Sequence, residues 1–236
     1  MDSDHSEVAV PNKLVPIVDE VERSTMQEAL NANVRGLALD YFSQSHLEAE
    51  FTESLISSRQ NISPKRLVEP GPDTEQFAQI FRAAAAAPDH GLVRPWRFVV
   101  VPVSKRAALA EAFALALIDR DPGATLEQIE AAREKAHRAP CLVLAVAQLG
   151  DCEPPIPKLE RMVSVGAAIQ NILLSAHSQG YGSSLTSGQA MQSQRLRDLF
   201  LLKEGEEAVC CINIGTVSKR KMPRLRPDIA TFVSSL

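Results

Sequence analysis

Polar and cationic residues that could bind a ligand gather in four segments that lie far apart in the chain. These segments are Ser58–Asn61, Ala87–His90 with Arg94–Phe98, Gly180–Gly188, and Gly215–Thr216 with Lys219–Arg220. Taken singly, each segment has an ordinary interpretation, because a lone arginine is usually a solvated surface cation and a glycine-serine stretch is usually a turn. Considered together, they indicate a site assembled from distant parts of the chain.

The sequence motifs of several other chemistries are absent. The chain has no Gly-x-Ser-x-Gly, no His-Glu-x-x-His, no Gly-x-x-x-x-Gly-Lys and no Gly-x-Gly-x-x-Gly after a predicted strand. Its four cysteines form no Cys-x-x-Cys pair and no metal-ligand spacing with the five histidines, so we interpret them as reduced structural thiols. Cys210 and Cys211 are adjacent. Neighbouring strand residues point to opposite faces, which disfavours joint redox chemistry.

Composition narrows the classes of partner. The 236 residues are 45% hydrophobic and 23% charged, with a formal net charge of -4 and both signs interspersed. Such a chain lacks the basic stripe that binds nucleic acid or an acidic membrane. The longest apolar stretch, Cys141–Ala147, is too short to span a bilayer, and the acidic start has no apolar signal core. We therefore expect a cytoplasmic protein with neither nucleic-acid nor membrane partners.

The chain is predicted to have an N-terminal extension and one larger domain. Residues 1–57 are acidic with few core patterns, and we expect an extension that is partly helical or disordered. Within it, residues 18–38 and 47–56 have helical potential. Residues 58–236 alternate between strand-like and helix-like periods and form the predicted catalytic domain. The role of the extension stays open.

Capping residues and apolar spacing predict five helices after the extension. They run from Asp73 to Pro88, from Ser104 to Asp119, from Thr125 toward His137, from Met162 to Gly180 and from Ser193 to Leu202. Gln76 completes a capping box with Asp73, and Gln128 completes another with Thr125. Ser104 and Ser193 are expected as caps, and Gly180 as a C-terminal glycine.

Three strands are predicted from apolar runs rich in valine and isoleucine, at Arg97–Val103, Cys141–Ala147 and Ala208–Gly215. The second run is too uniformly apolar to be half exposed, which places it in the centre of the sheet. The whole pattern is one of mixed helices and strands without internal repeats.

Several phrases of the sequence occur together in one known family. They are Arg66-Leu67-Val68-Glu69-Pro70, Ala87-Pro88-Asp89-His90, Pro95-Trp96-Arg97-Phe98, Gln179-Gly180-Tyr181-Gly182 and Gly215-Thr216. In their order and spacing, the last three quarters of the chain resemble the nitroreductase family, especially its compact branch of single-domain NAD(P)H nitroreductases.

The resemblance implies an α+β fold with a central mixed β-sheet flanked by helices, and an intertwined homodimer with FMN at the interface. It also implies a ping-pong reaction in which NADPH or NADH delivers a hydride to flavin N5 and a small nitroaromatic or quinone acceptor then takes it. Because the flavin performs the difficult chemistry, no dedicated catalytic acid or base is expected.

The resemblance also assigns residues to the FMN phosphate. Arg59 occupies the family's first phosphate-binding position, and Arg220 or its neighbour Lys219 matches a late basic residue. Guanidinium groups suit a phosphate because they donate paired hydrogen bonds. The family usually has Arg-Arg-Ser or Arg-His-Ser where this chain has Arg59, Gln60 and Asn61, so hydrogen-bonding capacity is kept and one charge is lost.

Other positions match the flavin ring. Either Lys65 or Arg66 would face the N1 and O2 edge, and the sequence does not decide between them. His90 would reach the flavin or its ribityl chain from the neighbouring subunit, or else would end a helix structurally. Close relatives often carry an arginine where this chain has Ala86. Trp96 is expected to pack in the core or interface.

A glycine-serine loop completes the site that the resemblance implies. Thr186, Ser187 and Gly188 align with the loop after Gly180–Gly182 that cradles the isoalloxazine through backbone groups, since small residues let the backbone approach a planar ligand.

Three functional hypotheses remain. The first is an FMN-dependent NAD(P)H oxidoreductase that reduces small electrophilic acceptors. The second keeps the fold but makes the protein a specialised flavin-dependent dehydrogenase, or an enzyme with flavin as its substrate. The third is a cofactor-free binding module, suggested by the departures at Gln60, Asn61 and Ala86. The preferred acceptor and the choice between NADH and NADPH stay open.

Overall fold

The strand β3 (Cys141–Gln148) forms the centre of the fold. Its six inner residues are all buried, and it lies between β2 (Trp96–Val100) and β5 (Glu206–Val217), with both pairs antiparallel. Leu144 and its alternate neighbours pack into one hydrophobic cluster, whereas Ala145 and its alternate neighbours pack into the other. The predicted central position of this strand is confirmed, because only a strand covered on both faces can be apolar throughout.

The sheet has five strands in the order β1–β5–β3–β2, and β4 (Gly182–Thr186) pairs with the second half of β5. β1 (Leu67–Val68) is short and pairs with the end of β5. All of these pairs are antiparallel. Within the described residues, the parallel component of the expected mixed sheet is one isolated bridge between Asn61 and Ser183.

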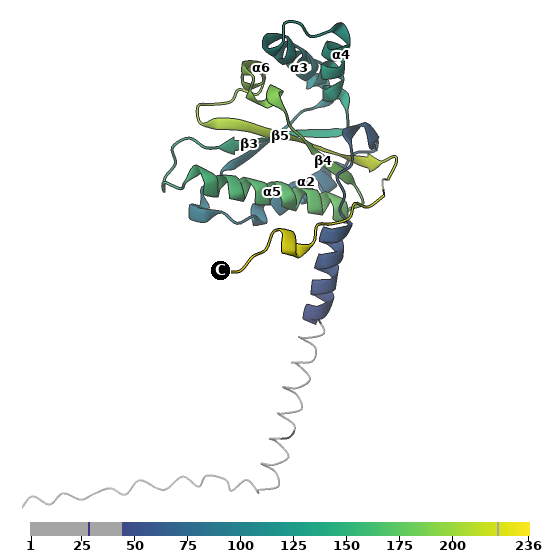
Figure 1. The fold of residues 1–236 in the computed structure, drawn as a ribbon, viewed down its shortest axis with the longest axis vertical. Coiled ribbons are helices and arrows are strands. Elements are labelled where there is room, and N and C mark those ends of the chain that lie inside the picture. Colours follow the sequence, from purple (N-terminus) through teal and green to yellow (C-terminus); the bar gives the residue numbers. More distant parts are fainter. Residues whose placement is uncertain (1–27, 29–43, 221) are drawn as a thin grey trace, which may run out of the picture. The chain divides into compact units, whose positions relative to one another are not determined.

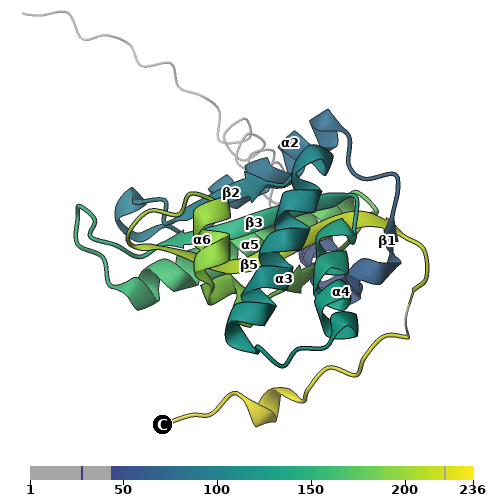
Figure 2. The same cartoon turned by 90° about the horizontal axis from the view of Figure 1, so that it is seen from above.

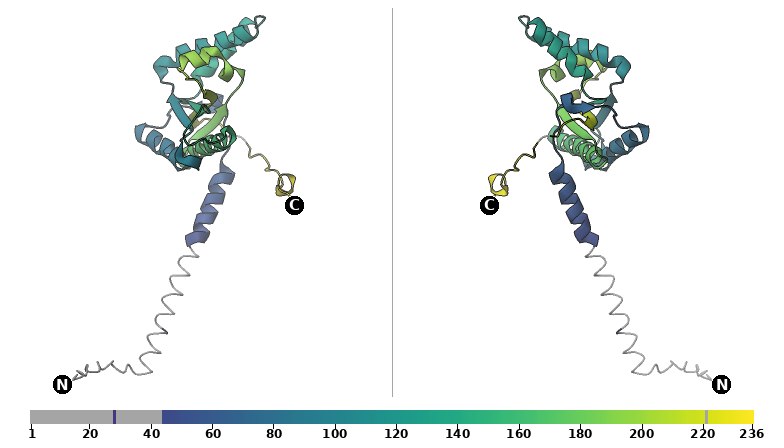
Figure 3. Two further views of the ribbon diagram at one scale, coloured as in Figure 1. Left: turned by 90° about the vertical axis from the view of Figure 1, so that its left-hand side faces the viewer. Right: turned by 90° about the vertical axis from the view of Figure 1, so that its right-hand side faces the viewer.

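Helices cover both faces of this sheet (Figures 1 and 3). One layer contains α2 (Thr74–Arg82) and α5 (Lys158–Ser178), and the other contains α3 (Arg106–Arg120), α4 (Leu126–Glu134) and α6 (Gln194–Leu199). Figure 2 looks onto the second layer, with the strands behind it. The expected α+β class, with a sheet flanked by helices, is confirmed.

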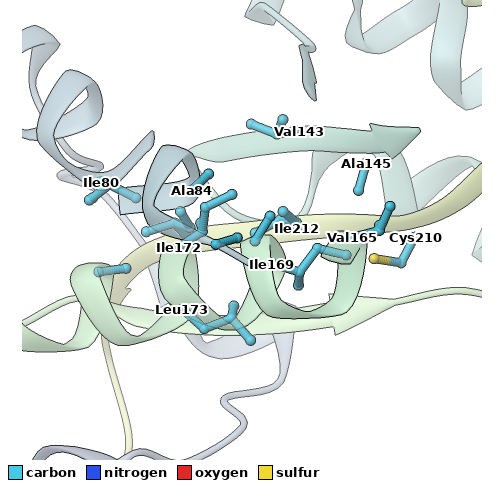
Figure 4. Packing of buried hydrophobic residues seen from close by; sticks show 14 of the residues in the cluster. Ile80, Ala84, Val143, Ala145, Val165, Ile169, Ile172, Leu173, Cys210 and Ile212 are labelled. Carbon is cyan, nitrogen blue, oxygen red and sulfur yellow. The ribbon is translucent and has the colours of Figure 1, made fainter. Parts of the chain in front are cut away.

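The long helix α5 supplies much of the hydrophobic cluster that contains Ala145. Figure 4 shows Val165, Ile169 and Ile172 of α5 facing the side of the sheet that carries Ile212. Ile80 of α2 is fully buried in the same cluster. Burying each such aliphatic side chain contributes about 1.5–3 kcal/mol. This packing fixes the end of α5, next to which the candidate site lies.

Four of the five predicted capping residues are confirmed. Capping boxes form at Asp73 with Gln76 and at Thr125 with Gln128. The Ser193 hydroxyl accepts from the backbone N–H of Leu196 at the start of α6. α5 ends just before Gly180, which has φ +86° and therefore suits a residue without a Cβ.

One predicted cap is wrong. The Ser104 side chain caps no helix, because Ser104 lies inside a 3₁₀ turn, Val103–Lys105, and α3 starts after Lys105 without a side-chain cap. Pro102 precedes that turn, and β2 ends at Val100 rather than at Val103. A proline cannot donate to a strand ladder, which explains the shorter strand.

Other element bounds also differ from the predictions. The helix from Asp73 gives way at Arg82 to a 3₁₀ turn, Ala83–Ala86. α6 ends at Leu199 instead of Leu202. β3 and β5 extend further than expected, with β5 reaching Val217. β4 was expected to be a loop. Its glycine and serines are residues typical of a loop. In the structure a Cβ on Gly182 would lie 2.5 Å from the Val217 side chain, so only glycine fits at this close approach.

The computed structural model describes residue 28, residues 44–220 and residues 222–236. Residues 44–58 are helical, which includes the predicted helix at 47–56, whereas the predicted helix at 18–38 lies outside the described residues except for Glu28. The chain divides into two units, Met1–Glu53 and Ser54–Leu236. The domain boundary expected after residue 57 stays a prediction. None of the helices in the described ranges has the length and apolar character needed to cross a membrane.

Candidate functional site

A cationic cavity lies where the segment after residue 58 meets the C-terminal tail. Its volume is about 220 Å³, and it is lined by Arg59, Gln60, Asn61, Ser63, Met222, Arg224 and Arg226. The segment is held against β4: the backbone N–H of Ile62 donates to the carbonyl of Ser183 at 3.0 Å, and Ile62 itself is buried. The sheet therefore fixes the direction in which Arg59 and its neighbours face.

Arg59 lies at the centre of this charge cluster. Burial lowers its pKa, and the nearby positive charge of Arg226 lowers it further. Its Nε is buried and bonds to no acceptor among the described residues. A buried donor without a partner is costly, which makes this atom a candidate for contact with a ligand.

His177 connects the predicted cations to one another. Its Nε2 lies 2.9 Å from the Ser58 hydroxyl, and its pKa is lowered first by burial and then by the positive charges of Arg59 and Arg220. Arg59 and Arg220 are far apart in sequence, yet the fold places both charges near enough to the same imidazole to lower its pKa. Lys219 is exposed and lines neither this cavity nor the larger one described next.

A larger cavity of about 460 Å³ lies between the loop after β4 and the helices α3 and α4. Its lining includes the predicted residues Thr186, Ser187 and Gly188. Gly188 has φ +151°, a conformation open in practice only to glycine. The three predicted residues are therefore brought together, although Thr186 ends a strand and only the two that follow it belong to a loop.

Asn213 of β5 is a site residue that the sequence did not reveal. It is 1% exposed, and its Nδ2 donates to the Thr186 hydroxyl at 3.1 Å. It also lines the larger cavity. A single amide within the apolar run Ala208–Gly215 was the available signal, because a buried amide needs partners that a fully apolar strand lacks.

The linings of the two cavities contain residues that are neighbours in the chain. Ser63 lines the cationic cavity and Pro64 lines the larger one. Pro64 begins a 3₁₀ turn that ends at Arg66, whose carbonyl accepts from the Ser218 backbone N–H at 2.9 Å. Within this turn Lys65 is exposed and Arg66 is half-buried. The chain therefore passes from the cationic cavity to the larger one within two residues.

His90 lies apart from these cavities within one chain. It is exposed in a 3₁₀ turn, and its Nδ1 lies 2.6 Å from a carboxylate oxygen of Glu160 at the start of α5. It lines neither the cationic nor the larger cavity. Trp96 lines a separate, mostly apolar cavity beside α2. It packs against the hydrophobic cluster that contains Ala145 and the buried face of α5, as expected for a packing residue.

The described residues hold no group of histidine, cysteine and acidic side chains suited to a metal ion. Burial raises the pKa of Cys210 to about 11 and that of Cys211 to about 12. These thiols stay protonated at neutral pH, and they belong to opposite hydrophobic clusters. The interpretation of the pair as structural is consistent with this placement.

Comparison with known proteins identifies the family of the chain. A family model described as "Nitroreductase family" matches residues 63–216. A protein of Haemophilus influenzae named "Putative NAD(P)H nitroreductase" is 32% identical over 184 residues, which cover 78% of this chain and 98% of that protein.

Solved structures show the same fold. The nitroreductase-like family protein from Bacillus cereus superposes with a TM-score of 0.68 at 17% identity, over 78% of this chain and 94% of that one. An FMN-dependent nitroreductase from Clostridium difficile gives a TM-score of 0.52 at 19% identity, over 73% and 91% of the two chains. The family match spans well over half of the sequence, and the chain therefore belongs to the nitroreductase family of oxidoreductases.

Proposed function

We propose that this protein is an FMN-dependent NAD(P)H oxidoreductase that reduces small electrophilic acceptors of the nitroaromatic or quinone type. The observation that carries the proposal is a cationic cavity whose lining includes Ser63 and a larger, partly apolar cavity whose lining includes the next residue, Pro64. FMN has the matching chemistry, since a phosphate carrying nearly two negative charges stands at one end and a flat ring at the other. The relatives described above carry names that refer to FMN and NAD(P)H.

The phosphate end fits the cations present. Arg59 would donate from its unpartnered Nε, and Arg220 would add a second charge beside His177. Gln60 and Asn61 line the same cavity and would be further donors, whereas Lys219 lines neither cavity. An anion would also reduce the repulsion between guanidinium groups, which is otherwise unfavourable in a half-buried site.

The ring end fits the loop after β4. Gly188 and Ser187 let the backbone approach a planar group, and Asn213 holds Thr186 in place through its 3.1 Å hydrogen bond. A cation at Lys65 or Arg66 would stabilise negative charge at the N1 and O2 edge. Phe113 and Leu117 of α3 contribute apolar side chains to the lining of this cavity and would pack against a flat ring.

Bound FMN would supply the redox chemistry by carrying a hydride from NADPH or NADH to the acceptor. The chain's own contribution is binding, orientation and charge, so we assign no side chain as a catalytic acid or base. A small acceptor and the nicotinamide would use the larger cavity in turn, in keeping with a ping-pong order.

We further propose a homodimer. On α5, Leu159 is 78% exposed and Val163 is 67% exposed, and they lie one helical turn apart. Large apolar side chains exposed side by side on a core helix indicate a partner surface. His90 contacts Glu160 of the same helical turn, so a second copy packed on α5 would meet His90 at the interface. This arrangement supports the prediction that His90 acts on the flavin of the neighbouring subunit.

Absorbance spectra test the proposal directly. Purified protein should be yellow with a flavin spectrum, or should regain it when FMN is added to the colourless protein. Anaerobic addition of NADH or NADPH should bleach that spectrum, and the faster of the two identifies the preferred reductant. Protein that stays colourless with FMN would refute the proposal, and yellow protein that neither nicotinamide bleaches would favour the dehydrogenase alternative.

A further inference from the structure

A row of polar side chains crosses the sheet face that lines the larger cavity. Three strands contribute to this lining: Leu142 comes from β3, Cys211 and Asn213 from β5, and Thr186 from the end of β4. Asn213 pairs with Leu142 on one side and with Ser184 on the other. Residues directly opposite each other in an antiparallel sheet share a face. An amide and two hydroxyls therefore lie on the same face as the buried leucine and cysteine.

The backbone determines which way the Asn213 amide faces. Its Nδ2 donates to the carbonyl of Cys211 at 3.2 Å and to that of Ser184 at 3.4 Å. Carbonyl oxygens only accept hydrogen bonds, so the amide nitrogen, and not the amide oxygen, must face them. The same nitrogen lies 3.1 Å from the Thr186 hydroxyl. The Thr186 oxygen is therefore the acceptor of this hydrogen bond.

The hydrogen of the Thr186 hydroxyl stays available for a ligand. A threonine hydroxyl has one hydrogen and two lone pairs, and Asn213 uses a lone pair. No hydrogen bond in the described part of the chain has this hydroxyl as its donor. Thr186 is exposed and lines the larger cavity, whereas Asn213 is 1% exposed. The fold thus presents one hydroxyl donor, held by a buried amide, to the occupant of the cavity.

A second hydroxyl of the same row has no partner. Ser184 is 1% exposed, and its Oγ is buried without a hydrogen bond to any described residue. Buried polar groups are normally satisfied, so a strand that serves packing alone would have an apolar residue at such a position. The polar row therefore indicates a ligand at this face of the sheet.

We propose that Asn213 and Thr186 form a hydrogen-bond relay to the flavin ring, in which Asn213 holds the Thr186 oxygen and the Thr186 hydroxyl donates to the C4 carbonyl of the isoalloxazine. The relay rests on the proposed function, because the ring is taken to be that of FMN. A cation at Lys65 or Arg66 would serve the N1 and O2 edge, which leaves the C4 carbonyl for a neutral donor. Thr186 is a binding residue, and Asn213 is a positioning residue that acts through it.

No proton is transferred in this relay. Reduction of the flavin increases the electron density on its ring carbonyls, and a hydrogen-bond donor aimed at one of them stabilises the reduced ring more than the oxidised ring. The relay therefore raises the reduction potential of the bound flavin.

The test compares two substitutions at Thr186 on the full chain loaded with FMN. Thr186→Val removes the hydroxyl and keeps the branched shape, whereas Thr186→Ser keeps the hydroxyl. Anaerobic titration against reference dyes should show that reduction is about tenfold less favourable in Thr186→Val, a potential about 30 mV lower for the two-electron couple, and close to the wild-type value in Thr186→Ser. The infrared stretch of the C4 carbonyl should move to higher frequency in Thr186→Val alone. Thr52→Val, at an exposed threonine that lines neither cavity, is the control.

Asn213→Leu tests the positioning role. It should lower the potential as Thr186→Val does, and adding Thr186→Val to it should have little further effect, because the hydroxyl has already lost its orientation. Strictly additive effects would mean that Thr186 donates without Asn213 and would overturn the relay. Thr186 is exposed at the end of β4, so its own variants test the donor even if Asn213→Leu fails to fold.

Two further results would overturn the relay. An unchanged potential and carbonyl stretch in Thr186→Val would mean that the hydroxyl does not contact the C4 carbonyl. Equal shifts in Thr186→Val and Thr186→Ser would mean that any change at the end of β4 disturbs the ring. Failure of the proposed function has a different signature. Wild-type protein that cannot be loaded with FMN refutes both proposals, whereas loaded wild type with unaffected variants refutes the relay alone.

Discussion

Arg106 and Arg59 are both withdrawn from solvent, yet they differ in what their guanidinium groups contact. Arg106 is 5% exposed, and its Nε, Nη1 and Nη2 donate to the carbonyls of Val101, Ala136 and Pro140 at 2.8–3.0 Å. Arg59 has a buried Nε with no partner in the described structure and a second guanidinium nearby. Each nitrogen of the Arg106 guanidinium donates to a carbonyl, whereas Arg59 keeps a buried donor without an acceptor.

The difference separates a structural role from a binding role. A buried cation whose donors are all used stabilises the loops that supply the carbonyls, here those around the start of α3 and of β3. A cation with an unused buried donor and a like-charged neighbour reduces stability until a ligand arrives. Removing Arg106 should therefore change the stability of the fold, and removing Arg59 should change the affinity for a ligand.

The largest effect is expected for Arg106→Met. The substitution leaves three carbonyls without their donors, so the free energy of unfolding should fall by about 3 kcal/mol. Urea unfolding followed by circular dichroism measures this change. FMN affinity of the folded protein should stay that of the wild type. A loss below about 0.5 kcal/mol would show that water replaces the guanidinium and that the contrast with Arg59 is not one of structure against binding.

Arg59→Ala should give the opposite pattern. FMN affinity should fall about 100-fold, since the variant loses a charge and its paired donors to phosphate. The free energy of unfolding without flavin should change by less than about 0.5 kcal/mol, because the lost packing is offset by relief of repulsion with Arg226. Fluorescence titration and urea unfolding on the same preparation measure both. Arg82→Ala, at an exposed arginine in the last turn of α2, is the control. A large loss of stability with normal FMN binding would contradict the assignment.

The contrast also shows where sequence reasoning succeeds. β3 was placed correctly in the centre of the sheet because an unbroken apolar run can only be buried on both faces. The capping boxes at Asp73 and Thr125 were predictable because both partners lie three residues apart. Local chemistry decides such features. β4 was missed because Ser183 and Ser184 are buried there only through pairing with β5, which is distant in sequence.

The candidate site was only partly predictable for the same reason. The family's motif positions pointed to Arg59 and Gly188, and in the fold each of them lines one of the two cavities. Arg226 and His177 carried no motif, because their relevance arises from tertiary contacts with Ser57, Ser58 and Arg59. Whether His90 reaches a flavin depends on a second copy of the chain, and one chain's sequence pattern contains little information about such a contact.

A cation introduced at residue 60 tests the binding role of this segment by adding a charge instead of removing one. Gln60→Arg should raise FMN affinity about tenfold, by returning a cation to the segment beside Arg59. In this background Arg59→Ala should cost less than it does in the wild type, because the two cations serve the same phosphate. A double-mutant cycle on FMN dissociation constants measures the coupling. Strictly additive effects would mean that residue 60 and Arg59 act on separate groups.

The smallest effect is expected for His177. Its ring has one hydrogen-bond partner, the Ser58 hydroxyl, and the positive charges of Arg59 and Arg220 disfavour its protonated form. Its pKa is lowered from 6.5 in the folded chain, by burial first and then by Arg59 and Arg220. Above pH 6.5 the ring is neutral in both states. As the pH falls below that value the unfolded chain takes up the proton first, so stability declines until the lowered folded pKa is passed.

Without flavin, the free energy of unfolding should therefore show a component that falls with pH below 6.5, and His177→Gln should remove it. The component should stay under about 1 kcal/mol, because solvent screens the half-buried ring. His137→Gln, at an exposed histidine, is the control. Bound phosphate should shrink the component, since a negative charge raises the pKa of the ring and offsets Arg59 and Arg220. An unchanged pH dependence of stability in His177→Gln would mean that Arg59 and Arg220 lie too far from the ring to act on it. It would then count against the proposal that both arginines bind the same phosphate.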